Sequence, residues 1–300
     1  MKRPRREDDH EKAAGGDGND EEHYACSSIL RLPEACLAHA ISLTTPVDAC
    51  RSSAVSAAFR AAASSDAVWE GFLPLGYRSV LARADHPVDL TCSKMEVFLS
   101  LAQDHVLLDQ RTKSFWLERT SGAKCYMLSS RSMSIIWGEN PLYWRQVYLP
   151  DSRFEEVSEL LAVCWLDIAG SIDREELSPN TKYAAYLVFN LAEESYGLDS
   201  PTQEASITVG DRLVSANRVV CLHPRDMEET PLTGGAEQAE EGRVSYPRER
   251  DDGWMEVELG EFYNDQQGST GVVVVRLAEQ VQLNWKKGLI LEGVEITPKK

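Results

Sequence analysis

The sequence predicts two domains of different class, a small all-α module followed by a larger all-β sandwich. Apolar residues recur at helical spacing between Ser27 and Leu73. From about Leu107 onward, short apolar runs alternate with turn residues, as they do in β-sandwiches. No stretch in this second part has the length and period of a long helix, so a doubly wound α/β fold is disfavoured.

Composition narrows the classes of partner and compartment. A chain of 300 residues allows one large or two ordinary domains. The formal net charge of -17 disfavours nucleic acid as a partner, because phosphate binding needs basic surfaces. The seven cysteines are odd in number and lack paired spacing, which favours a reduced cytoplasmic or nuclear compartment. The charged N-terminus disfavours a signal peptide, and the lack of an apolar run near ~20 residues disfavours a membrane-spanning segment.

The first 26 residues have almost nothing to bury. They mix basic and acidic side chains around Gly-rich spacers, so we expect residues 1–26 to be a disordered tail. The basic cluster from Lys2 to Arg6 is either a nuclear address or part of a solvated tail.

Residues 27–73 are predicted to form a module of short helices. Thr45 is an N-cap, Pro46 follows at the first helical position, and Asp48 lies where the helix dipole favours negative charge. A last helix starts near Ser65 and carries Val68, Trp69, Phe72 and Leu73 on one face. About fifty residues in short helices make a marginal core, so such a module usually needs a partner.

Residues 74–106 are predicted to be a semi-ordered connector. Gly76 to Thr91 shows no sustained period, and Ser93 to Leu101 is expected to be a short helix. This connector would set where anything bound by the second domain is held.

Residues 107–300 are predicted to form the sandwich. Val163–Ile168 and Tyr183–Asn190 are runs suited to strands buried on both sides. Residues 226–252 contain Glu, Gly and Pro and should form a mobile acidic loop. The other expected strands are Phe115–Leu117, Lys124–Leu128, Trp254–Gly260, Val272–Leu277 and Leu289–Ile296.

The stretch Ser134–Trp144 places three aromatic residues beside a turn. Ser134 to Trp137 alternates like a strand, Gly138 to Pro141 supplies turn residues, and Tyr143 and Trp144 follow. Aromatic rings on a loop offer a stacking surface for the apolar face of a sugar. The alternative is that both Trp residues are core residues of the sandwich.

Other chemistry is poorly supported. Asp167, Asp173, Glu175 and Glu176 could be considered as a glycosidase pair, but nothing places two of them across a bond. Cys221-Leu222-His223 lacks a second ligand pair for zinc. Lys286 and Lys287 could contact a polar ligand, but they are interpreted as a solvated basic pair. We therefore expect no catalytic residue, no metal and no cofactor.

The residues of the helical module resemble the F-box. The resemblance implies docking onto the Skp adaptor of a cullin-RING ubiquitin ligase, with Leu32, Pro33, Leu37, Ile41 and Leu43 as contacts. The alternative is a self-contained helical bundle. The matching elements, in order, are Leu32-Pro33-Glu34, Ile41-Ser42-Leu43, Thr45-Pro46-Val47-Asp48, Cys50-Arg51, Ser56-Ala57-Ala58-Phe59-Arg60 and Val68-Trp69-Glu70.

The second domain resembles the phloem lectins, or Nictaba-like lectins, in which a preceding F-box is a known plant arrangement. The resemblance implies a jelly-roll-like sandwich that binds N-acetylglucosamine oligomers and the core of N-linked glycans. The matching motifs are Ser114-Phe115-Trp116-Leu117, Gly122 with Lys124-Cys125-Tyr126-Met127, Ser134-Ile135-Ile136-Trp137-Gly138 with Tyr143-Trp144, Trp165-Leu166-Asp167-Ile168 with Gly170, Tyr183–Phe189, Asp252–Val257 with Leu259–Phe262, and Trp285-Lys286-Lys287-Gly288.

The lectin resemblance also implies site residues. Trp137, Trp144 and Glu279 stand at positions linked to sugar binding in that family. A second acidic position of the lectins is occupied here by Val272. The loss of a hydrogen-bonding partner at such a site can cost ~1–3 kcal/mol, so weak, altered or absent sugar binding is expected.

Together these resemblances predict a non-enzymatic substrate receptor of an SCF-type ubiquitin ligase. The F-box would hold the adaptor, and the lectin-like domain would recruit a target, with an N-glycan or N-acetylglucosamine as one mode of recognition. Two alternatives stay open. The protein could be a cytoplasmic or nuclear lectin that acts without a ligase, or a receptor whose β-domain binds protein instead of glycan.

Overall fold

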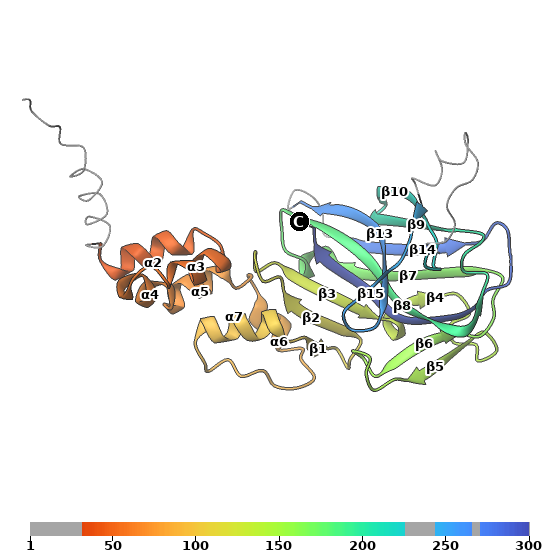
Figure 1. The fold of residues 1–300 in the computed structure, drawn as a ribbon, viewed down its shortest axis with the longest axis horizontal. Coiled ribbons are helices and arrows are strands. Elements are labelled where there is room, and N and C mark those ends of the chain that lie inside the picture. The colour runs from red at the N-terminus through yellow and green to blue at the C-terminus, as the bar shows by residue number, and fades with distance from the viewer. Residues whose placement is uncertain (1–31, 226–243, 266–270, 300) are drawn as a thin grey trace, which may run out of the picture.

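A computed structural model describes residues 32–225, 244–265 and 271–299 (Figure 1). A group of short helices forms one end of the molecule, and a sheet-rich body forms the rest. The predicted tail 1–26, residues 27–31 of the helical module and residues 226–243 of the predicted acidic loop lie outside the described residues. No helix among the described residues is both long enough and apolar enough to cross a membrane.

The helical module forms as its caps predict. Thr45 Oγ1 accepts a hydrogen bond from the backbone N–H of Asp48 at 3.2 Å, and the Ser65 side chain caps the last helix. Trp69 is buried there, and its indole N–H donates to the carbonyl of Ala63 at 2.7 Å. The four helices of the module are α2 (Glu34–Ser42), α3 (Pro46–Ser52), α4 (Ala57–Ala63) and α5 (Asp66–Phe72).

The connector is more ordered than the sequence indicated. It contains α6 (Tyr77–Leu81) and the predicted short helix, which is α7 (Lys94–Gln103) with a capping box at its start. The Phe98 ring of α7 lies 5.3 Å from the Trp69 ring of α5, and α7 also packs on strand β2 (Lys113–Leu117). The predicted short helix is therefore confirmed as α7, whose apolar face packs on α5 and β2, whereas α6 was not predicted.

Two sheets form the sandwich in the described part of the chain (Figure 1). Every pairing is antiparallel except the short parallel contact of β10 with β11. The nine-stranded sheet contains β1 (Val106–Leu108), β2 (Lys113–Leu117), β3 (Lys124–Ser129), β15 (Lys287–Pro298), β8 (Thr181–Tyr196), β13 (Met255–Asn264) and β12 (Arg248–Glu249), with β6 (Glu156–Leu160) also paired to β15 and β5 (Trp144–Tyr148) paired to β6. The six-stranded sheet has the order β11 (Val244–Ser245), β10 (Arg212–Val220), β9 (Gln203–Val209), β14 (Val272–Glu279), β7 (Leu166–Asp173), β4 (Ser134–Ile135).

Of the two strands predicted to be buried on both sides, one is confirmed. In β8 the run from Tyr183 to Phe189 is buried on both faces apart from Tyr186, which is half-buried. The prediction for Val163–Ile168 was wrong, since β7 begins only at Leu166 and alternates between buried and less buried residues. The outward-facing Asp167 of β7 pairs with Arg276 on β14 at 2.6 Å, which shows that this sheet has one solvated face.

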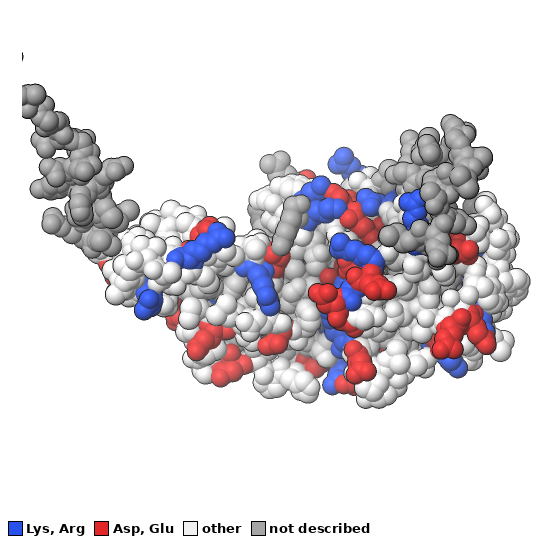
Figure 2. All heavy atoms as spheres, viewed as in Figure 1, with Lys and Arg blue, Asp and Glu red and all other residues white. Residues whose placement is uncertain are grey.

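The acidic loop was predicted too long. Residues 244–252 are described and include β11 and β12, and Arg250 forms ion pairs with Glu256 at 2.5 Å and with Glu295 at 3.2 Å. Arg250, which was predicted to lie in a mobile loop, is instead paired with residues of β13 and β15. Figure 2 shows this interspersion of acidic and basic side chains on one face of the sandwich.

Candidate functional site

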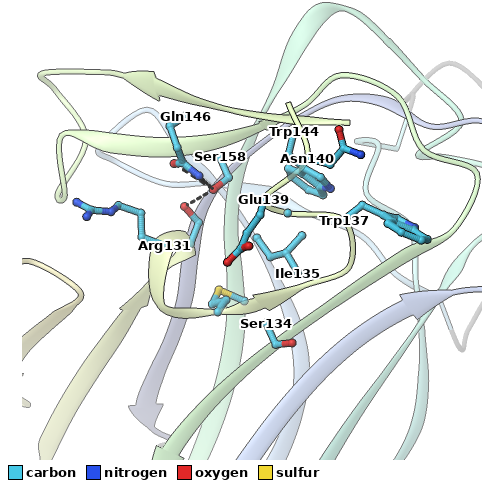
Figure 3. Close-up of a pocket in the computed structure, with 12 residues that line it drawn as sticks. Arg131, Ser134, Ile135, Trp137, Glu139, Asn140, Trp144, Gln146 and Ser158 are labelled. Carbon is cyan, nitrogen blue, oxygen red and sulfur yellow. Dashed lines mark hydrogen bonds between the residues drawn. The ribbon is translucent and has the colours of Figure 1, made fainter. Parts of the chain in front are cut away.

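A cavity of about 630 Å³ opens between the edge strands of the two sheets. Its walls come from the chain around β4, from the turn Trp137–Asn140, and from β5 and β6 (Figure 3). The volume is in the range of pockets that hold a small ligand. The structure therefore brings both predicted tryptophans, Trp137 and Trp144, to one cavity.

Trp137 presents its ring to solvent at this cavity. Its side chain is 52% exposed, and its ring centroid lies 6.0 Å from that of Tyr143. The predicted strand ends at Ile135, because the chain turns so sharply that Trp137 adopts φ = 59°. A bulky residue in the left-handed region stores strain of roughly 1–3 kcal/mol, and such strain gathers at functional sites. The turn is closed by a hydrogen bond from the backbone N–H of Asn140 to the carbonyl of Trp137 at 2.9 Å.

Trp144 belongs to the core and to the cavity wall at once. It is the first residue of β5 and only 2% exposed, so its ring face cannot stack on a sugar as an exposed ring would. Its buried indole N–H has no acceptor among the described residues. A buried donor without an acceptor costs roughly 1–3 kcal/mol. The two predicted tryptophans thus differ, since Trp137 offers a stacking surface and Trp144 offers at most a donor.

Polar groups that the sequence did not single out line the other side of the cavity. Gln146 Nε2 donates to Ser158 Oγ at 3.0 Å, and Ser158 Oγ donates to Ser130 Oγ at 2.9 Å (Figure 3). Glu139 is exposed, lines the cavity and has no hydrogen-bond or ion-pair partner among the described residues. Its carboxylate is free to accept hydrogen bonds from hydroxyl or amide groups of a ligand. The sequence did not single out Glu139, which looks like an ordinary residue of the turn after Trp137.

Glu279 does not line this cavity. It ends β14, where its carboxylate accepts hydrogen bonds from the backbone N–H groups of Val281 at 2.9 Å and Gln282 at 2.8 Å. Lys286 Nζ donates to it at 2.6 Å and is itself 0% exposed, so the interpretation of Lys286 as a solvated residue was wrong. Burial alone would raise the pKa of Glu279, but the hydrogen bonds from Lys286 and the two N–H groups hold it below its ordinary value. The carboxylate of Glu279 already accepts hydrogen bonds from three protein donors. Sugar binding by Glu279 stays a prediction.

Val272 lies at the opposite end of β14 from Glu279. It pairs with Asp173, is half exposed and does not line the cavity. The apolar residue at this position therefore removes no hydrogen bond from the cavity wall. The expectation that Val272 weakens sugar binding has no support from this geometry.

Of the five predicted adaptor contacts in the helical module, three are exposed and two are buried. Leu32, Pro33 and Leu43 are exposed, and Leu43 is 75% exposed. Leu37 and Ile41 lie on the inner face of α2 and are buried in the core, so a partner cannot reach them in this conformation. Adaptor binding itself stays a prediction. Val55 is a further exposed apolar residue of the module and was not among the five predicted contacts.

Comparison with known proteins gives one family. The family model described as phloem protein 2 matches residues 123–298. The chain is 41% identical to the F-box protein PP2-B10 of Arabidopsis thaliana over 89% of this chain and 93% of that protein. It is 40% identical to the F-box protein PP2-B15 of the same plant, over 90% of this chain and 97% of that protein, and 37% identical to its F-box protein VBF, over 90% and 100%.

Proposed function

Because this chain belongs to the phloem protein 2 family, as an F-box protein with a lectin-like domain, we propose that it is the substrate-recognition subunit of an SCF-type ubiquitin ligase. In this proposal the helical module binds the Skp adaptor of a cullin-RING ligase in the cytoplasm or nucleus. The sandwich recruits a target that carries an N-acetylglucosamine-containing glycan. The protein itself makes and breaks no bond.

One observation carries the proposal: the two surfaces lie toward opposite ends of the molecule. Helix α2, with exposed Leu43 just after it, lies at the helical end, whereas β4 and β5 of the cavity lie well into the sandwich (Figure 1). An adaptor and a target could therefore bind together. Holding a target beside the ligase raises the effective concentration of its lysines and replaces an encounter in bulk solution.

The adaptor surface can be tested with exposed residues alone. We expect Leu32→Asp combined with Leu43→Asp to weaken binding to purified Skp adaptor about tenfold or more, because charge would replace apolar contact residues. Folding should be unchanged, since both side chains are exposed. Calorimetric titration measures the affinity. Val281→Asp on the sandwich, at an 87% exposed residue, is the matched control and should bind as the wild type does. Equal affinity for all three proteins would contradict adaptor docking through this surface.

The sugar site can be tested with two tryptophans of like exposure. We expect Trp137→Ala to weaken binding of the N-acetylglucosamine trimer about tenfold or more, because the stacking surface is lost. Trp285→Ala removes a 56% exposed ring that does not line the cavity, and should leave the affinity unchanged. Titration calorimetry of the full chain gives both values. Equal losses in the two variants would contradict the assignment of the cavity.

A second candidate function is recognition of protein by the same domain. A backbone bridge between Val163 and Lys286 joins two loops, and Trp165 and Trp285 beside that bridge are both exposed. Exposed aromatic residues are typical anchors of protein interfaces. If millimolar trimer gives no heat with the wild type, this surface is the better candidate for target recruitment.

A further inference from the structure

A second cavity, of about 600 Å³, lies where the helical module meets the sandwich. One side is formed by the chain that leaves α5, from Phe72 to Leu75. The other side is formed by Lys124 at the start of β3 and by the loop Arg174–Pro179 after β7. Ligand pockets of this size are common at domain interfaces. None of its lining residues belongs to the cavity beside Trp137.

Lys124 lines this cavity and is a buried cation. The residue is 6% exposed, and Nζ makes one hydrogen bond among the described residues, to the carbonyl of Glu175 at 3.3 Å. An ammonium group carries three N–H donors, so two of them have no protein acceptor there. Burial lowers the pKa of Lys124, which is the cost of holding this charge away from water.

The neighbouring charges other than Glu175 are already paired. Glu175 also lines the cavity, is exposed and has no ion-pair partner among the described residues. Arg174 pairs with Asp265 at 2.5 Å, so this cation and this anion cancel each other. Glu176 is held by Arg83 at 2.9 Å and by Lys113 at 2.5 Å. Lys124 is therefore left without an ion-pair partner of its own among the described residues.

The backbone around Lys124 is held rigidly. Its N–H donates to Ser178 Oγ at 3.0 Å, and its carbonyl accepts from the Tyr183 hydroxyl at 3.0 Å. That hydroxyl in turn accepts the N–H of Ser178 at 2.9 Å, and Asn264 Nδ2 donates to the Ser178 carbonyl at 3.0 Å. The base of the cavity is thus preorganised, which lowers the entropy cost of binding a ligand.

We propose that this cavity binds a small organic monocarboxylate, with the carboxylate on Nζ of Lys124 and an apolar body against Phe72, Leu73 and Leu177. A carboxylate would use the donors that Lys124 leaves free, and the three apolar residues all line the cavity. A dianion such as a phosphate is disfavoured, because Glu175 and Asp265 also line the cavity and Lys124 is its single unpaired cation among the described residues. The ligand would contact both domains, so its binding should stabilise their junction.

The first test compares 2-naphthoate with 2-naphthamide, a neutral molecule of the same shape, by calorimetric titration into the full chain. We expect naphthoate to bind about tenfold or more tightly than naphthamide and to raise the melting temperature, because only the anion completes a charge-assisted hydrogen bond. Lys124→Met should abolish this preference. Failure of naphthoate to bind at millimolar concentration, or equal binding of both probes, would overturn the proposal.

A second set of variants tests naphthoate binding at this cavity even if Lys124→Met does not fold. Leu75 lines the cavity and is 94% exposed, so its replacement leaves the core intact. Leu75→Asp should weaken naphthoate binding and Leu75→Arg should strengthen it, each by about threefold, and neither should change naphthamide binding. Leu142→Asp, at an exposed residue of the sandwich that does not line this cavity, is the charge-matched control. Naphthoate affinity that is the same in both Leu75 variants would overturn the proposal. Adaptor binding is not involved, so this result is independent of the proposed ligase role.

Discussion

Lys286→Met is expected to lower the free energy of unfolding by about 3 kcal/mol. The ammonium of Lys286 is 0% exposed and donates to Glu279 at 2.6 Å and to the carbonyl of Asn284 at 2.8 Å. Removal of one partner from a buried ion pair costs about 3–5 kcal/mol, because the other charge stays buried. The lower end applies here, since Glu279 keeps two backbone N–H donors. Denaturant titration measures the change, and the melting temperature should fall by roughly 6–12 °C.

The neighbouring residue supplies the control for this prediction. Lys287 pairs with Glu194 at 2.9 Å, but the Glu194 side chain is 85% exposed. An exposed ion pair contributes about 0–1 kcal/mol, so Lys287→Met should change stability little. Equal effects of the two substitutions would show that burial of the Lys286 pair has no energetic role.

The same pair predicts a pH dependence. The pKa of Glu279 is held below its ordinary value of 4.5, so the folded protein binds this proton less readily than the unfolded chain does. The stabilisation is present in full above about pH 4.5 and is lost as the pH falls through the lowered pKa of the folded state. The difference in stability between the wild type and Lys286→Met should therefore shrink in acid. A difference that is constant from pH 7 to pH 3 would contradict this account.

The sequence predicted the elements of the fold better than it predicted burial. The N-cap at Thr45 and the strand at Tyr183–Asn190 were found because local hydrogen bonding and apolar runs determine them. The environment of Lys286 was missed, because a lysine paired inside the protein has the same sequence signature as a lysine in solvent. The ion pairs of Arg250 were missed for the same reason, since neither the nearby Glu256 nor the distant Glu295 shows in the sequence that it faces Arg250.

At the candidate site, too, the sequence predicted position better than burial. The aromatic stretch around Trp137 predicted where a cavity lies, but not which ring faces solvent. That difference depends on the turn at φ = 59°, which ends β4 early and places Trp137 outside and Trp144 inside. Glu139 and Gln146 could not be singled out either, because polar residues beside a turn are ordinary until the opposite wall of the cavity is known.

The junction between the domains should depend on one glycine. Gly122 has φ = 71°, and a Cβ atom there would overlap the carbonyl oxygen of Phe72 and lie 3.2 Å from the Phe98 ring. The turn that contains Gly122 is fixed, because the Gly122 N–H donates to the Glu118 carbonyl at 2.8 Å. An added methyl group would therefore push on the end of α5, at the boundary with the sandwich.

We expect Gly122→Ala to lower the free energy of unfolding by about 2–5 kcal/mol, as the sum of left-handed strain and overpacking. Gly210→Ala is the matched control, since Gly210 has φ = 57° and a Cβ atom there would meet no other atom within 4 Å, so it should cost only about 1–2 kcal/mol. Hydrogen exchange of the full chain should show faster exchange in α5 and α7 for Gly122→Ala alone. If both alanines had equal effects, the close approach of Phe72 to Gly122 would not be what holds the helical module against the sandwich.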